Sequence, residues 1–133
     1  MMVGGAIRES VTVAGLAGRA RVARAFVSGV LGPGHPGGDD AVLLVGELFA
    51  NSIRHSGSGA PGQTVTVTVA ARDSVVRVEV ADRSGPGVPQ LRPADGEAEG
   101  GRGLQLVQRL SAGWGWHRDS GQTVTWFEIL RYR

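Results

Sequence analysis

The spacing of apolar residues in the first half of the chain predicts one strand followed by two helices. Val11 and Val13 alternate with polar neighbours, which indicates a strand over residues 6–13. Apolar residues then recur at every third or fourth position over residues 15–31, with arginines between them, as in an amphipathic helix. The stretch GPGHPGG ends this helix, and a second helix is predicted over residues 40–56.

The second half of the chain predicts two antiparallel hairpins and a short helix. In QTVTVTVAA the valines lie on one face and the threonines on the other, which is typical of a half-buried strand. The expected elements are strands over residues 63–71 and 75–82, a helix over 104–112, and strands over 114–118 and 122–130.

A long stretch rich in glycine and proline, residues 84–103, lies between the two hairpins. A loop of this length is either a lid over a functional site or a linker, and too little sequence follows it for a second domain. We therefore expect an α+β fold in a single domain spanning residues 1–133. It would be a two-layer α/β sandwich with a mixed or antiparallel sheet, helices on one face, and a lid.

The composition excludes several classes of chemistry. All 14 basic residues are arginine, and there is no cysteine. Without lysine there is no P-loop lysine, Schiff-base chemistry or conventional kinase lysine. Without cysteine there is no disulfide, thiol nucleophile or thiolate zinc site. Phosphate chemistry would depend on backbone amides, arginine or a metal ion.

The charge pattern argues against a nucleic-acid-binding protein. The net charge is +2, acidic residues lie among the arginines, and aromatic residues make up only 5% of the chain. Nucleic-acid binders usually carry a basic stripe with interleaved aromatic residues. No targeting signal or membrane-spanning apolar run is visible. We expect a cytoplasmic protein that binds neither nucleic acid nor membranes.

Three polar side chains share one face of the helix predicted over residues 40–56. At about 100° per residue, Asn51 lies about 40° from Glu47, and Arg54 lies about 20° from Glu47 on the other side. Such a face is common on helices that face solvent, so solvation alone explains it. A ligand surface is the alternative, because an asparagine side chain in mid-helix competes for backbone hydrogen bonds.

Two other positions are candidates for ligand contact. Asp82 ends a valine-rich strand, and it is either a turn former or a carboxylate that accepts a hydrogen bond from a ligand amino group. The sequence GGRG, residues 100–103, leads into the third predicted helix, whose free N–H groups and dipole favour an anion. It matches neither the P-loop nor the dinucleotide-binding fingerprint.

The order and spacing of these elements resemble the GHKL ATPases, the superfamily of gyrase, heat-shock chaperone, histidine-kinase and mismatch-repair ATP-binding domains. ELFANSIRHS resembles the N box, VEVADRSGPG the first glycine box, GGRGLQLV the second glycine box, and GQTVTWFEI the closing strand. The resemblance extends over about residues 15–131. Within the superfamily, GRGLQLVQRLSAGWGW followed by TVTWFE is most similar to the stand-alone anti-sigma factor serine/threonine kinases of high-GC bacteria.

The resemblance implies that the motif residues bind ATP and Mg²⁺. By that resemblance Asn51 holds the magnesium ion, Glu47 is the general base, and Arg54 lies near the phosphates. Asp82 would accept a hydrogen bond from the adenine amino group, and Thr123 would lie near the adenine. The glycine boxes would contribute Gly85, Gly87, Gly101, Arg102, Gly103 and Leu104.

The first glycine box departs from the family pattern. Ser84 and Pro86 stand where the family has glycines, and the glycines are Gly85 and Gly87. Either the turn is one residue longer or the loop beside the adenine is rearranged. Gln105, where many relatives have a further glycine, is a smaller departure.

The activity that the resemblance implies is transfer of the γ-phosphoryl group of ATP to a serine or threonine. The acceptor would be an anti-sigma antagonist protein, and the chain would also sequester a sigma factor. The resemblance is compatible with a homodimer. The alternative is a non-catalytic nucleotide-sensing or protein-interaction module of the same fold, which the altered first glycine box favours.

Overall fold

The computed structural model describes residues 6–56, 62–72, 74–83 and 102–130, apart from the side chains of His55, Ser56, Arg102 and Leu104. A 3-10 turn, η2 (Ala17–Arg19), precedes the first helix. The other elements are β1 (Ile7–Ala14), α1 (Ala20–Leu31), α2 (Gly38–Ser56), β2 (Thr64–Arg72), β3 (Val75–Asp82), α3 (Arg102–Leu110), β4 (Gly113–Asp119) and β5 (Gln122–Leu130). This is the predicted order of strands and helices.

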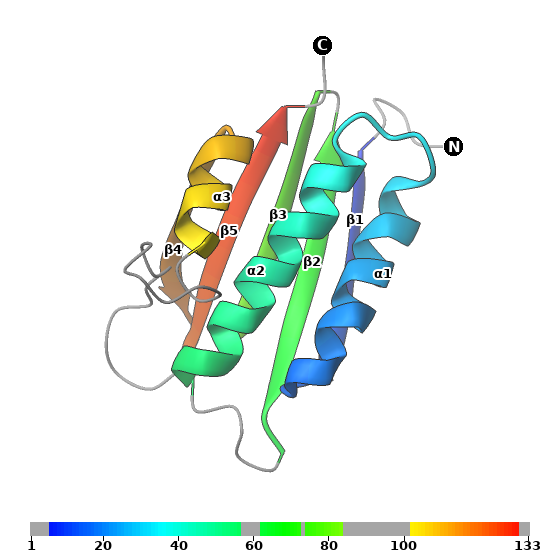
Figure 1. Ribbon diagram of the computed structural model, residues 1–133. Helices are drawn as coiled ribbons and strands as arrows, with labels where there is room; N and C mark the ends of the chain where they lie inside the picture. Colours follow the sequence, from blue (N-terminus) through cyan, green and yellow to red (C-terminus); the bar gives the residue numbers. More distant parts are fainter. Residues whose placement is uncertain (1–5, 57–61, 73, 84–101, 131–133) are drawn as a thin grey trace.

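The five strands form one sheet with the order β1-β2-β3-β5-β4. Every neighbouring pair is antiparallel, so the sheet is antiparallel and not mixed. The three helices lie on one face of the sheet, with α1 over β1 and β2, α2 over the middle, and α3 beside β4 and β5 (Figure 1). The expected two-layer α+β sandwich is confirmed.

The core lies between the helices and one face of the sheet. In β3 every second residue is buried, because the side chains of a strand point alternately to its two faces. The valines of β2 follow the same alternation, and Thr68 on the other face is buried as well. The valines of these strands pack against the apolar stripe of α2. The largest fully buried side chains of the core are Phe49, Phe127, Leu44 and Leu48.

Glycines and one histidine determine where α1 ends and where α2 begins. Gly32 has a φ of 86° and donates its N–H to Ser28 O, so it ends α1 in a conformation that other residues rarely adopt. The second helix begins at Gly38, two residues before the predicted start. Its preceding turn is closed by the Gly37 N–H, which donates to Nδ1 of His35 over 2.9 Å.

Two other predicted boundaries differ from the structure. The helix expected over residues 15–31 is α-helical only from Ala20, because residues 17–19 form the tighter 3-10 turn η2. The helix expected over 104–112 begins at Arg102 and ends at Leu110. Most of the expected lid, residues 84–101, lies outside the described residues.

The sheet face without helices is polar and is held by side-chain contacts. Arg77 contacts Glu79 at 2.9 Å and Glu128 at 3.0 Å, and its guanidinium stacks over the Trp126 ring at 4.2 Å. Hydroxyl pairs also join β1 to β2 on this face. No helix in the described part of the chain is long and apolar enough to cross a membrane.

Replacing Phe127 by alanine tests the position of the core. Phe127 is fully buried in β5 opposite Val78, so Phe127→Ala should lower the free energy of unfolding by about 3–5 kcal/mol. Urea denaturation followed by tryptophan fluorescence measures this loss. Leu16 is 52% exposed, and Leu16→Ala is the control, with an expected change below about 0.5 kcal/mol. Equal losses in the two variants would contradict the assigned core.

Candidate functional site

The polar residues predicted on α2 differ in their exposure to solvent. Arg54 is exposed and Glu47 is partly buried, whereas Asn51 is only 2% exposed. A face that is merely solvated would expose its asparagine. The burial of Asn51 therefore removes the solvation interpretation for this residue.

The amide oxygen of Asn51 is a candidate ligand atom. Oδ1 is buried and makes no hydrogen bond with any residue that the structure describes. Leaving such an atom unsatisfied costs about 1–3 kcal/mol, so its retention indicates a partner. Mg²⁺ prefers oxygen ligands and is usually held by one or two protein groups together with phosphates and waters. The chemistry of Asn51 fits this mode.

The described residues contain no cluster of three or more histidine, cysteine or acidic side chains suited to a metal ion. A cage built from protein groups alone is therefore not found in this part of the chain. The fit to Mg²⁺ depends on phosphate oxygens as the further ligands.

Glu47 of α2 meets the first turn of α3 at Gly103. A Cβ atom added at Gly103 would lie 3.3 Å from Oε1 of Glu47, so an alanine here would displace the carboxylate by a few tenths of an ångström. The N–H groups in the first turn of a helix have no partner within that helix and attract anions. The structure thus brings the predicted base next to a backbone suited to phosphate, although the two segments are far apart in the sequence.

Asp82 and Thr123 are neighbours in the sheet. Asp82 is the last residue of β3, and its register partner in β5 is Thr123. They are 5% and 1% exposed, on the face that the helices cover. The two residues that the resemblance assigns to the adenine therefore lie side by side in the sheet.

Ser52 is a buried polar residue beside Asp82 that the sequence analysis did not single out. It is buried in α2, and its hydroxyl donates a hydrogen bond to Oδ2 of Asp82. A signal for it was present, because Ser52 follows Leu48 by four residues and Phe49 by three and so lies on the apolar stripe. A serine on such a stripe needs a hydrogen-bond partner inside the core.

Several predicted site residues are not placed by the structure. Gly85, Gly87 and Gly101 lie outside the described residues. Arg102 and Leu104 belong to the first turn of α3, but their side chains are outside the described part.

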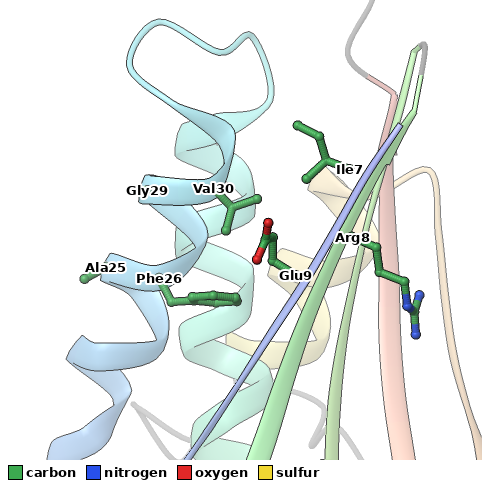
Figure 2. A pocket seen from close by; sticks show the side chains of 7 residues that line it. All are labelled: Ile7, Arg8, Glu9, Ala25, Phe26, Gly29 and Val30. Carbon is green, nitrogen blue, oxygen red and sulfur yellow. The ribbon is translucent and has the colours of Figure 1, made fainter. Parts of the chain in front are cut away.

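A groove of about 780 Å³ lies elsewhere, between α1 and the edge strand β1. Figure 2 shows Phe26 and Val30 pointing from α1 toward β1, Glu9 pointing toward α1, and Arg8 pointing away. None of the predicted site residues that the structure describes lines this groove. It is therefore separate from the residues assembled around α2.

Comparison with known proteins agrees with this geometry. The family model described as the histidine kinase-like ATPase domain matches residues 12–129. No curated protein matches the sequence significantly.

Two solved structures share the fold at low sequence identity. The structure of the RsbU and RsbW domains of Rv1364c from Mycobacterium tuberculosis matches with a TM-score of 0.64 and 22% identity, over 96% of this chain and 33% of that chain. The histidine kinase domain of the blue-light activated histidine kinase from Erythrobacter litoralis EL346 matches with a TM-score of 0.54 and 22% identity, over 86% of this chain and 60% of that chain.

The family match covers the N-box helix, the strand that ends at Asp82, and the closing hairpin. It confirms the resemblance to GHKL ATPases that the motifs indicated. The chain belongs to the histidine kinase-like ATPase family.

Proposed function

We propose that this chain is a Mg-ATP-dependent protein serine/threonine kinase of the anti-sigma type. It would phosphorylate an antagonist protein and sequester a sigma factor. The contact between Glu47 and Gly103 carries the proposal, because it joins the predicted base to the helix end suited to phosphate. The mycobacterial structure, which contains RsbU and RsbW domains and shares this fold over part of its length, supports the choice within the family.

The residues around α2 provide the groups that phosphoryl transfer needs. The reaction depends mainly on alignment and charge neutralisation. Glu47 would accept the proton of the serine or threonine hydroxyl. The hydroxyl oxygen would bond to the γ-phosphorus as the bond from that phosphorus to ADP breaks. Asn51 would hold Mg²⁺, which supplies positive charge at the phosphates. Arg54 would contact the terminal phosphate.

A second candidate is a nucleotide-sensing module without kinase activity. The specific observation that favours it is the first glycine box, where Ser84 and Pro86 replace the family's glycines. Mg-ATP binding without phosphoryl transfer to any antagonist would support this candidate. Absence of Mg-dependent ATP binding in calorimetry would contradict both.

The variant Glu47→Gln separates binding from catalysis. A carboxamide keeps the size of the side chain but cannot accept a proton at neutral pH, so transfer should fall by about 10²–10⁴-fold. ATP affinity should change little. The measurement is label transfer from γ-labelled ATP to a candidate antagonist. Glu79→Gln, on the opposite face of the sheet, is the control, and transfer that survives in Glu47→Gln would rule out the base.

The variant Arg54→Ala tests the cation near the phosphates. If the guanidinium meets the terminal phosphate, ATP affinity should fall by about tenfold and ADP affinity by clearly less. Calorimetry with the two nucleotides measures the difference. Arg72→Ala, at the exposed end of β2, is the control. Equal losses of affinity for ATP and ADP would show that Arg54 does not contact the terminal phosphate and is an ordinary solvent-exposed residue.

The variant Gly103→Ala tests the contact that carries the proposal. The added Cβ would press on the Glu47 carboxylate, so phosphoryl transfer should fall by about tenfold or more. Stability should be kept, because alanine favours a helix more than glycine does. Gly29→Ala in α1 is the control, since its Cβ meets nothing within 4 Å. Full activity in Gly103→Ala would show that Glu47 need not stay in this place.

A further inference from the structure

The hydroxyl of Ser52 is the buried contact between α2 and Asp82 at the end of β3. Both residues lie in the interior, 6% and 5% exposed, where a polar group is retained only with a partner. In this bond the hydroxyl is the donor and Oδ2 is the acceptor. The bond therefore fixes where Oδ2 of Asp82 lies.

A carboxylate at a strand end turns easily without such a contact. The terminal torsion of aspartate is broad and roughly twofold, so the carboxylate plane is not set by the backbone alone. Ser52 belongs to a helix whose apolar stripe is held in the core, and it is a fixed reference point for that plane. A carboxylate offers about four acceptor positions, and the bond from Ser52 occupies only one of them.

We propose that Ser52 is a positioning residue that determines the base specificity of this site. By holding Asp82, it aims the carboxylate at the exocyclic amino group of an adenine nucleotide. A 6-oxo purine such as hypoxanthine presents an acceptor at the same place, so a fixed carboxylate repels it. Thr123, the register partner of Asp82, lies on the same buried face. The inference rests on the proposed ATP-binding function.

The test compares ATP with inosine triphosphate, which differs at the position the carboxylate would read. Calorimetry on the full chain gives both affinities for the wild type and for Ser52→Ala. We expect Ser52→Ala to lower ATP affinity by about tenfold and to change inosine triphosphate affinity by less than about twofold. The ratio of the two affinities then collapses, which a general loss of structure would not produce.

The matched control is Thr125→Val. Thr125 is also buried, on the helix-covered face of β5 opposite Val80, and the change removes a hydroxyl without touching Asp82. The ratio of ATP affinity to inosine triphosphate affinity in Thr125→Val should equal that of the wild type. Thermal unfolding verifies that Ser52→Ala and Thr125→Val both fold.

Three outcomes would overturn the inference. Equal losses of both affinities in Ser52→Ala would make Ser52 a structural residue only. An unchanged ratio with unchanged affinities would show that the contact has no effect on binding. A wild type that binds neither nucleotide would remove the proposed function itself, and with it this inference.

Discussion

The packing of α2 across the middle of the sheet is the constraint on which the rest of the structure depends. This helix contacts α1, α3, β3 and β5, and the apolar stripe on its sheet side is fully buried. Because this stripe fixes the rotation of the helix, it also fixes the directions of Glu47, Asn51 and Arg54. The candidate ligand contacts are thus oriented by the core itself.

Two consecutive polar residues interrupt this packing. Asn51 and Ser52 are both buried, and each lowers stability unless its polar atoms find partners. Asp82 accepts from Ser52, whereas Oδ1 of Asn51 has no partner among the described residues. An apolar pair would fill the space at lower cost. Their retention is typical of a site in which stability is given up for binding.

Much of the fold followed from the sequence because the apolar periods are clear. The alternating valines of β2 and β3 predicted both strands and their pairing, and GPGHPGG predicted the break between α1 and α2. The start of α2 was missed by two residues because it depends on the contact between Gly37 and the ring of His35. Such a contact inside a loop has no periodic signature.

The site was predicted less completely, for a related reason. The spacing placed Glu47, Asn51 and Arg54 on one face, and helix geometry alone establishes that. The approach of Gly103 to Glu47 depends on how α3 packs against α2, and the sequence places those helices far apart. The burial of Asn51 likewise depends on tertiary packing, which helical spacing does not report. The place of Ser52 on the apolar stripe could be predicted from the sequence, but its hydrogen bond to Asp82 in the sheet could not.

Because the chain has no lysine, side-chain recognition of phosphate would depend on arginine and therefore on the orientation of α2. A lysine is a flexible point charge, whereas a guanidinium recognises phosphate through two parallel N–H bonds in a fixed plane. Phosphate recognition by Arg54 would therefore need the helix held within a narrow range of rotation. The core stripe of α2 provides this restraint, and any change that lets the helix turn should weaken phosphate contact before it weakens the fold.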